Sequence, residues 1–478
     1  MQVLGIDVGT TAIKCSLVNC NKKLEKQSCK SIENASGSIV DVKNVLLAMQ
    51  KAMKELGTME NVTAIALCGQ MHGIVWWKAN KVLEALKNNT DDTPWSDLIT
   101  WQDKRCKKEF INELCHQRNL NGGIFTPLSS GYALATFAIM MQECPETIEK
   151  YDTCGTIMDL IAFLLAGHTS TKNATIDCTN AYSWGGFNTS TMSWDVPTLK
   201  AWNIPMHFMP RPCLPGKDIV GKTCSTASNV FNVPEQIPIY VPMGDHPCSV
   251  YALLHSTSLN AKDALLVNIG TSAQLAFVLE DNLPTTPSFE IRPYFNQQKI
   301  AVVAALTGGN VFAKFVENCI KWTFDMTNFT ITDKDTAYVN IIAAANKNTT
   351  LVCRPTLLGE RNEGISAGEI VNLTMDNWTL GDMSAAIAKG IVNNLFELLP
   401  PSAKPLIRHR TVIGSGNALV KNELLQHYTN ELTGRPIVLA PSSDASFGAS
   451  LLISEALPYL MAKQKHRYFI SVCGCAQR

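Results

Sequence analysis

The start of the chain predicts a β-hairpin with a glycine turn. An apolar run over residues 3–6 leads to Asp7, the turn Gly9-Thr10-Thr11 follows, and an alternating run then carries Lys14 on its opposite face. Two extended runs around a short turn are typical of a hairpin. A turn of this kind exposes backbone N–H groups and hydroxyls and can hold phosphate oxygens. An ordinary structural hairpin at the N-terminus has the same pattern and stays an alternative.

A second stretch of the same design lies far downstream. An apolar run over residues 266–269 leads to the turn Gly270-Thr271-Ser272, and another alternating run follows it. Asp7 has the chemistry to hold a hydrated Mg²⁺, because this ion favours carboxylates and retains water. The two stretches together predict two related domains that bind the phosphates of one nucleotide.

The length and the net charge of the chain predict its number of domains and argue against some classes of function. The chain has 478 residues, which predicts two to three domains, and its net charge of zero argues against a nucleic-acid or membrane-surface partner. No apolar run reaches the length of a membrane span. Residue 1 leads directly into a strand pattern without a basic leader, so we expect no signal peptide. The sixteen cysteines then predict reduced thiols in a cytoplasmic protein.

Strand and helix patterns alternate along the rest of the chain. This alternation predicts an α/β fold with helices that cover the sheets. We expect the domain boundary at residues 256–263, just before the second hairpin. The predicted division is an N-terminal domain over 1–258, a C-terminal domain over 259–460 and a tail over 461–478.

Two segments match catalytic motifs by their letters alone. Residues 216–223 match a P-loop, and residues 364–368 match the nucleophile elbow of hydrolases. The proline-rich approach at 210–215 excludes a central strand before the first motif, and residues 224–232 show no helical stripe after it. A polar loop precedes the second motif. We therefore predict neither a P-loop nor a hydrolase.

Asp245 is the candidate for acid–base chemistry. It follows a strand predicted over residues 237–243 and precedes a helix predicted over 247–257. In one interpretation the carboxylate caps the helix. In the other it faces a γ-phosphate and accepts the proton of a substrate hydroxyl, since phosphoryl transfer needs mainly positioning and charge neutralisation.

Polar and aromatic side chains near other predicted strand ends are candidates for binding a sugar. Gln70 and His72 flank Met71 directly after a buried strand, and the alternative is a loop with a satisfied histidine. Trp101 offers an aromatic face for the C–H surface of a sugar, and Asp103 offers a carboxylate for neighbouring hydroxyls. The alternatives are a core tryptophan and a cap for a helix predicted over 104–115.

Glycine turns in the second half are candidates for binding a base. Gly308 with Gly309, and Gly414 with Gly416, can let a flat ring approach the backbone closely. Tight packing between helix and strand explains such glycines equally well.

The order of these motifs resembles the FGGY family of carbohydrate kinases over nearly the whole chain. The resemblance implies an α/β fold of two actin-like ATPase (ribonuclease H-like) domains with a central cleft. It implies ATP and Mg²⁺ as cofactors and a small-molecule ketose as substrate. It implies no nucleic-acid or membrane partner, and a monomer or a homodimer.

The resemblance also assigns roles to individual residues. It implies that Asp245 is the catalytic base and that Asp7 holds Mg²⁺ through water. His246 stands where the family usually has a glutamine. The remaining implied roles are phosphate binding by Gly9, Thr10, Thr11, Lys14, Gly270, Thr271 and Ser272, substrate binding by Gln70, Met71, His72, Trp101, Asp103 and His246, and adenosine binding by Gly308, Gly309, Gly414, Gly416 and Asn422.

Finer segments are similar to the sedoheptulokinases within this family. They lie at residues 101–105, 181–189, 306–311 and 355–361. The similarity implies ATP-dependent phosphorylation of the terminal primary hydroxyl of sedoheptulose to give sedoheptulose 7-phosphate. A xylulokinase or another ketose kinase of the family is the alternative. A sugar sensor without activity should lack Asp7 or Asp245, and a chaperone or filament ATPase should lack the polar motif near His72.

Overall fold

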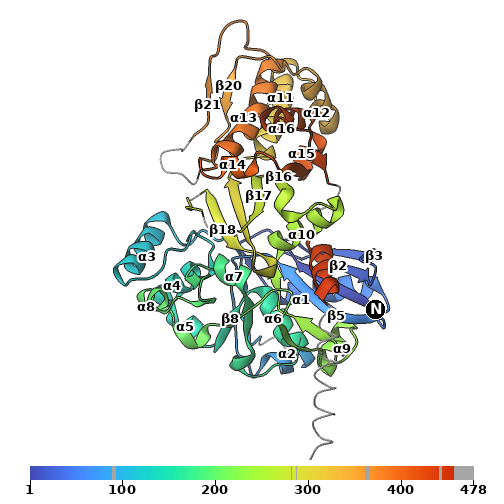
Figure 1. Cartoon of the computed structure of the whole chain (residues 1–478), viewed down its shortest axis with the longest axis vertical. Helices are drawn as coiled ribbons and strands as arrows, with labels where there is room; N and C mark the ends of the chain where they lie inside the picture. The colour runs from blue at the N-terminus through green and yellow to red at the C-terminus, as the bar shows by residue number, and fades with distance from the viewer. Residues whose placement is uncertain (89–92, 281–282, 287, 361–366, 441–443, 457–478) are drawn as a thin grey trace, which may run out of the picture. The chain divides into compact units, whose positions relative to one another are not determined.

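The computed structural model describes residues 1–88, 93–280, 283–286, 288–360, 367–440 and 444–456 (Figure 1). It forms two compact units, the first made of Met1–Ala252 with Asp444–Arg478 and the second of Leu253–Ser443. We predicted a boundary after residue 258 and placed residues up to 460 in the second domain. The division instead falls inside helix α10 (Asp245–Thr257), and the helix of residues 445–456 belongs to the first unit. The predicted tail at 461–478 lies outside the described residues.

The first unit is built around a seven-stranded sheet in the order β13-β14-β5-β1-β2-β3, with β15 also paired to β5. Strand β1 is antiparallel to β2 and parallel to β5, so the predicted N-terminal hairpin forms two adjacent strands of the sheet. The strands are β1 (Gln2–Val8), β2 (Ala12–Asn19), β3 (Leu24–Ser31), β5 (Val62–Gly69), β13 (Ile219–Lys222), β14 (Pro238–Tyr240) and β15 (Met243–Gly244).

Helix α1 (Val42–Leu56) covers this sheet through an apolar stripe. Val45, Met49 and Met53 recur at helical spacing, and all three are fully buried in the core of the first unit. The carboxylate of Asp41 accepts the N–H of Lys43 and caps the first turn. Helices α2 (Val82–Asn88), α6 (Ile157–Leu165) and α9 (Ser225–Phe231) contribute to the same core.

A smaller core in the same unit carries several of the candidate sugar residues. Trp76 meets the ring of Phe137 edge-on at 5.4 Å, and Phe137 meets Phe208 in the same way at 5.5 Å. The elements of this region are β4 (Ile39–Val40), β6 (Val75–Trp77), β7 (Leu98–Ile99), α3 (Lys108–Leu120), α4 (Ala133–Glu143), α5 (Pro145–Ile148), β8 (Thr153–Gly155), β9 (Thr175–Asp177), α7 (Cys178–Ser183), β10 (Phe187–Asn188), β11 (Ser193–Trp194), α8 (Val196–Ala201) and β12 (Arg211–Cys213).

The second unit has a six-stranded sheet in the order β18-β19-β17-β16-β22-β23. Figure 1 shows α11, α12, α13 and α16 grouped together in this unit, and α13 contacts each of the other three. The elements are β16 (Ala264–Ile269), β17 (Ala273–Leu279), β18 (Phe289–Pro293), β19 (Lys299–Ala305), α11 (Gly309–Thr327), α12 (Lys334–Ala343), β20 (Val352–Arg354), β21 (Glu369–Val371), α13 (Leu380–Glu397), α14 (Lys404–Ile407), β22 (Thr411–Ser415), α15 (Asn417–Lys421), α16 (Glu423–Thr433) and β23 (Val438–Leu439).

The two sheets repeat one strand order. In the first unit β3-β2-β1 is followed by β5 and β14, and in the second β19-β17-β16 is followed by β22 and β23. Each central strand, β1 or β16, is antiparallel to the next strand of its hairpin and parallel to its other neighbour. The second hairpin is therefore a structural counterpart of the first, as its sequence pattern predicted.

The region of the P-loop match differs from our expectation in one detail. Strand β13 lies inside the motif and pairs antiparallel with β14 at the edge of the sheet, which agrees with the rejection of a P-loop. Helix α9 follows it, although we predicted no helix there. The thiol of Cys224 caps this helix, and Phe231 is buried. Part of the second motif, residues 364–366, lies outside the described residues.

None of the helices in the described ranges has the length and apolar content needed to cross a membrane.

Candidate active site

The first turn joins β1 to β2 with its donors available. Val8 pairs with Ile13, and the N–H of Gly9 donates to the carbonyl of Ala12 at 3.1 Å. Thr10 is half-buried and Thr11 is exposed. Within the described part of the chain, no hydrogen bond occupies the backbone N–H of either threonine. This geometry suits a turn that receives phosphate oxygens.

Three neighbouring strands bring Asp7 and Asp245 to the same edge of the first sheet. Strands β1, β5 and β15 are parallel, with Asp7 opposite Cys68 and Cys68 opposite Met243. The chain leaves β15 at Gly244, and Asp245 begins α10 directly afterwards. Because the carboxyl ends of the three strands are level, the two carboxylates converge.

The electrostatics of Asp7 reflect this convergence. The pKa of Asp7 is raised from 3.8 to about 8, mainly by burial and then by the charges of Asp245 and Asp444, while Lys14 and the thiol of Cys68 act in the opposite direction. The side chain is 8% exposed, and its buried Oδ1 has no hydrogen-bond partner among the residues that the structure describes. A buried carboxylate among other carboxylates is the setting in which a divalent cation lowers the electrostatic cost.

These residues fit a hydrated Mg²⁺. In the described part of the chain no cluster of three acidic, histidine or cysteine side chains is arranged to hold a metal directly. Mg²⁺ commonly keeps several waters and binds through one or two carboxylates. Asp7, with its unpartnered Oδ1 and its acidic neighbours, therefore suits an ion held through water.

Asp444 is a residue of this cluster that the sequence analysis missed. Its carboxylate lies 4.0 Å from the ammonium of Lys14. Its Oδ1 also accepts the N–H of Phe447 at 3.0 Å and the hydroxyl of Ser446 at 2.6 Å, which caps the helix of residues 445–456. An aspartate before an apolar helical pattern is a cap signal, but that signal does not reveal contact with Lys14.

The backbone before Asp245 is held by a buried polar chain that sequence reasoning also missed. The N–H of Gly244 donates to the hydroxyl of Thr179 at 3.3 Å, and that hydroxyl donates to Asp177 at 2.6 Å. Burial raises the pKa of Asp177 to about 6, although hydrogen bonds from Thr179 and Asn180 oppose the shift. Asp177 caps α7, so its spacing to Thr179 was visible in the sequence only as a helix start.

Asp245 itself lies half-buried in the first turn of α10. Its Oδ1 accepts the backbone N–H of His246 at 2.7 Å, which places the residue that replaces the usual glutamine directly beside it. His246 is also half-buried. The partial positive charge of a helix N-terminus favours the ionised form of a carboxylate at this position.

Gln70 and Met71 support the turn and the strand end. Gln70 donates from its backbone N–H to Val8 at 3.0 Å and from its side chain to the carbonyl of Gly9 at 3.3 Å, while its buried Oε1 has no partner in the described part of the chain. Met71 packs against Gly244, where an added Cβ would lie 2.7 Å from the methionine sulfur. Gln70 retains an acceptor for a ligand, whereas Met71 makes packing contacts.

His72 is held in one orientation. Its backbone has a φ of 75°, a left-handed conformation that is uncommon for a residue with a side chain. The ring stacks on Tyr132 at 4.4 Å, and Nδ1 lies 2.6 Å from the carbonyl of Ser183. A carbonyl only accepts, so Nδ1 carries the proton in this contact.

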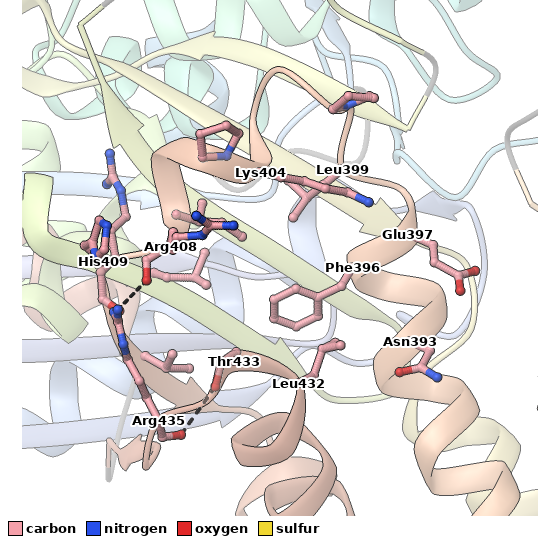
Figure 2. Close-up of a pocket in the computed structure, with 16 residues that line it drawn as sticks. Asn393, Phe396, Glu397, Leu399, Lys404, Arg408, His409, Leu432, Thr433 and Arg435 are labelled. Carbon is pink, nitrogen blue, oxygen red and sulfur yellow. Dashed lines mark hydrogen bonds between the residues drawn. The ribbon is translucent and has the colours of Figure 1, made fainter.

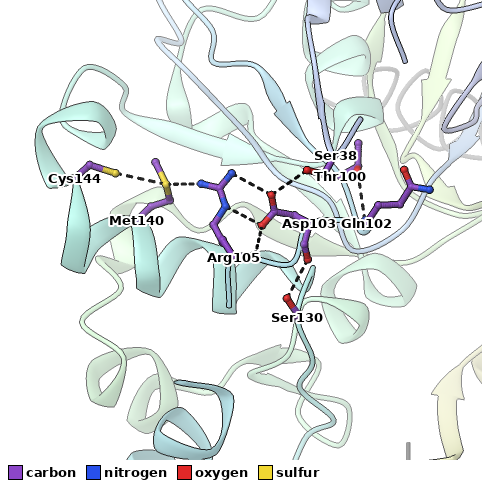
Figure 3. A network of polar contacts seen from close by, with 8 residues as sticks. All are labelled: Ser38, Thr100, Gln102, Asp103, Arg105, Ser130, Met140 and Cys144. Atoms are coloured by element: carbon purple, nitrogen blue, oxygen red, sulfur yellow. Dashed lines mark hydrogen bonds and ion pairs between the residues drawn. The ribbon is translucent and has the colours of Figure 1, made fainter. Parts of the chain in front are cut away.

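Trp101 and Asp103 occupy very different environments. The indole N–H of Trp101 donates to the hydroxyl of Thr10 at 3.0 Å, and the side chain is 47% exposed. Figure 3 shows Asp103 held by the guanidinium of Arg105, with Nε–Oδ1 at 2.8 Å and Nη2–Oδ2 at 3.1 Å, and by Ser38 at 3.3 Å. Burial alone would raise the pKa of Asp103, but Arg105 outweighs it and the pKa lies below its usual value. The predicted helix over 104–115 begins later, at the start of α3, because this pairing holds the chain in a turn.

The second turn is packed against the start of α11. Gly270 donates to the carbonyl of Ser272 at 3.0 Å, and Gly309 donates to Gly270 at 2.8 Å. An added Cβ at Gly308 would lie 2.5 Å from the carbonyl carbon of Ser272, whereas one at Gly270 would meet no atom of the described residues within 4 Å. The glycines of α11 thus allow its N-terminus to approach the turn.

Gly414, Gly416 and Asn422 also lie near this sheet edge. Gly416 has a φ of 90°, and an added Cβ would lie 2.4 Å from the side-chain oxygen of Asn268. Gly414 packs against Leu419 and Leu439. The buried Asn422 caps α16, and its oxygen accepts the N–H of Leu424 at 3.0 Å. Close packing therefore explains part of this glycine pattern, and adenosine binding by these residues stays a prediction.

The comparisons with known proteins agree with these features. The N-terminal domain of the FGGY family of carbohydrate kinases matches residues 2–251. The chain belongs to this family. The FGGY kinase is 30% identical over 481 residues to sedoheptulokinase of Mus musculus, an alignment that covers 95% of this chain and 97% of the mouse protein. It is 23% identical over 414 residues to a xylulose kinase of Staphylococcus epidermidis, which covers 83% of this chain and 76% of the bacterial one.

A solved structure shows the fold of this FGGY kinase. The xylulose kinase from Rhodospirillum rubrum matches with a TM-score of 0.77 at 16% identity, over 95% of this chain and 89% of that one. The predicted α/β fold with two actin-like ATPase domains is confirmed. The FGGY kinase is thus a carbohydrate kinase.

Proposed function

We propose that this FGGY kinase transfers the γ-phosphoryl group of ATP to the terminal primary hydroxyl of sedoheptulose and releases sedoheptulose 7-phosphate. Membership of the FGGY family supports phosphoryl transfer to a carbohydrate as the type of reaction. Similarity to the mouse sedoheptulokinase, which extends over 95% of this chain, supports the choice of ketose. The observation that carries the chemistry is the convergence of Asp7 and Asp245 at the ends of adjacent strands.

Asp245 is the catalytic residue in this proposal. It orients the terminal hydroxyl of the ketose and accepts its proton as the oxygen attacks the γ-phosphorus. The transferred phosphoryl group leaves ADP, so the products are the sugar phosphate and ADP. The Asp177–Thr179–Gly244 chain positions the backbone just before Asp245.

The two glycine turns supply donors for phosphate oxygens. The backbone N–H groups and hydroxyls of Thr10 and Thr11, with the ammonium of Lys14, act in the first unit, and Thr271 and Ser272 act in the second. When bound, Mg²⁺ neutralises part of the phosphate charge. Asp7 orders its water, and Gly308, Gly309, Gly414, Gly416 and Asn422 are the proposed adenosine contacts.

The residues that we propose to bind the sugar lie in different environments, and these environments suggest different roles. Gln70 and His72 carry polar side chains after β5, His246 follows Asp245 directly, and Trp101 presents a half-exposed aromatic face. Asp103 is already engaged by Arg105. We therefore propose that it holds the Trp101 loop in place and contributes to sugar binding through that loop.

The test of the ketose is a comparison of ADP release with ketoses of five, six and seven carbons. We expect the highest kcat/KM with sedoheptulose and a product phosphorylated on the terminal carbon. Xylulose is the second candidate, because the chain is also similar to a bacterial xylulose kinase. A higher kcat/KM with xylulose would reassign the substrate while leaving the kinase reaction intact.

We further propose that the kinase works in the cytoplasm. The fourteen cysteines in the described residues are all free thiols, and eight of them are buried. Reduced thiols of this kind are typical of a reducing compartment.

A further inference from the structure

The second unit has a pocket at the opposite end of its sheet from the second turn. Its lining includes Leu265, near the start of β16, and Val412, near the start of β22. The turn at Gly270 follows the other end of β16. Gly270 comes five positions after Leu265, which is about 16 Å along the strand at roughly 3.3 Å per residue. The pocket is thus separate from the residues proposed to bind ATP.

The pocket has the size and lining of a small-molecule site. Its volume is 770 Å³, within the range of roughly 300–1,000 Å³ typical of ligand pockets. Figure 2 shows the ring of Phe396 between Lys404 and Leu432 in this view. Leu399 and Ile407 add further apolar surface. Such a wall can contact the apolar body of a ligand.

The polar part of the lining is strongly basic. Lys404, Arg408, Arg410 and Arg435 line the pocket together with His409, whereas Glu397 is its one carboxylate among the described residues. The nearby charge of Asp263 acts on Arg410 from outside the lining. The four positive charges of the lysine and the three arginines therefore outnumber the two negative charges of Glu397 and Asp263 at this pocket.

Among the described residues, backbone carbonyls and no carboxylates accept hydrogen bonds from two of these guanidinium groups. Arg435 donates to the carbonyl of Arg410 at 2.7 Å and also to that of Arg408. Arg410 donates to the carbonyl of Leu406 at 2.9 Å and to that of Ala264 at 3.2 Å. A carbonyl satisfies an N–H group but does not cancel its charge. The two arginines are thus fixed in place while their charge remains available to an anion.

The other two cations extend from the same short segment. Lys404 and Arg408 are exposed, and no ion pair formed by the described residues includes either of them. Arginine presents a planar fork of donors that matches the oxygens of a phosphate group, and lysine adds a point charge. An apolar wall beside two held and two exposed cations is suited to a phosphate group that carries an apolar body.

We propose that this pocket binds a small organic phosphate, with the phosphate group among Arg408, Lys404 and Arg435 and the apolar body against Phe396 and Leu432. The site does not depend on which sugar the kinase phosphorylates. Because it lies at the far end of the strand that carries the second turn, its ligand acts as an effector or as a second, non-reacting ligand.

Isothermal titration calorimetry with phenyl phosphate tests the proposal on the full chain. This probe joins a phosphate group to an apolar ring. Inorganic phosphate and phenol report on the two halves separately. The titration is done without nucleotide and with saturating ADP and Mg²⁺, which occupies the proposed nucleotide site. We expect phenyl phosphate to bind in both conditions, more tightly than either half alone.

Matched charge variants locate the binding. Lys404→Glu should weaken phenyl phosphate binding about tenfold or more, because it replaces an attraction with a repulsion. Lys347→Glu makes the same change at an exposed lysine of the same unit outside the pocket and should leave binding unchanged. Arg408→Ala gives a second reading if the first variant does not fold, and circular dichroism melting checks all three.

The outcomes are decisive in either direction. Loss of binding in Lys404→Glu and Arg408→Ala, with normal binding in Lys347→Glu, supports the site. Equal affinity in all variants, or no binding of phenyl phosphate at about 10 mM, overturns it. If inorganic phosphate binds as tightly as phenyl phosphate, the apolar wall has no role in binding. If phenyl phosphate binding is lost only when ADP is present, the probe binds at the nucleotide site and the proposal is overturned.

Discussion

The two glycine turns occupy equivalent places in two sheets of the same strand order, yet their charges differ. In the first unit Asp7 lies opposite Lys14 across the hairpin, and in the second Asn268 lies opposite Gln274. The charges of Asp245 and Asp444 act on Asp7. The first unit thus concentrates the ionisable groups, whereas the second pairs neutral amides. The comparison teaches that one strand order can place either a cluster of charged side chains or a pair of neutral amides beside its glycine turn.

The two turns also differ in how they are closed and supported. The first closes from Gly9 to Ala12 and is held by the side chain of Gln70. The second closes one residue earlier, from Gly270 to Ser272, and is held by backbone groups at the start of α11. The first turn is thus supported by a side chain that we propose to contact the sugar, whereas the second is supported by backbone groups.

The largest expected effect comes from removing the proposed base. Asp245→Asn should lower kcat by about a thousandfold, since general base catalysis contributes roughly 10²–10⁴. ATP binding should change little, because the turns and Lys14 are untouched. Steady-state ADP release and nucleotide titration measure the two quantities.

The matched control for this variant lies in the second unit. Asn268→Asp makes the reverse change at the position equivalent to Asp7 and adds a charge to the neutral turn. It should weaken ATP binding and leave proton transfer intact. A kcat for Asp245→Asn within tenfold of wild type would rule out Asp245 as the base.

Asp7 should make the stability of the metal-free protein depend on pH. Its pKa is about 8 when folded, against 3.8 as the reference. Between these values the folded chain keeps a proton that the unfolded chain has lost, so stability falls as pH rises. Between pH 5 and pH 7 the loss is at most about 2.7 kcal/mol, because one proton corresponds to about 1.4 kcal/mol per pH unit.

Urea unfolding at pH 5 and pH 7 in the presence of a chelator measures this effect. Asp7→Asn should remove that part of the pH dependence and be more stable than wild type at pH 7. Added Mg²⁺ should stabilise wild type and not the variant. The same slope in wild type and Asp7→Asn would show that the carboxylate is ionised in the folded protein.

Sequence patterns predicted the parts of this site that depend on residues close together in the sequence. Both hairpins and the strand end before Asp245 follow from short apolar runs that end at glycine or aspartate. Asp444 was missed because its contact with Lys14 joins the two ends of the chain, which no local pattern reports. The late start of α3 has a similar cause, since a pairing between Asp103 and Arg105 outweighs helix propensity.

Two glycines of the second unit separate packing from ligand binding. Gly308→Ala should destabilise the protein by about 1–2 kcal/mol, because its Cβ would lie 2.5 Å from the backbone of Ser272. Gly270→Ala should leave stability unchanged, since nothing lies within 4 Å of the added Cβ. If that space receives a phosphate oxygen, the same variant should raise the KM for ATP several-fold. A normal KM in Gly270→Ala would show that the second turn does not contact the nucleotide closely.

The smallest expected effect comes from the hydrogen bond between the tryptophan loop and the first turn. Trp101→Phe keeps an aromatic face but removes the N–H that donates to Thr10 at 3.0 Å. One neutral hydrogen bond contributes about 0.5–1.5 kcal/mol, so kcat/KM should fall about two- to tenfold. Thr10→Val removes the other partner, and the double variant should lose little more than either single one if the two residues act through this bond. Losses that add in full would show that Trp101 contacts the sugar independently of the turn.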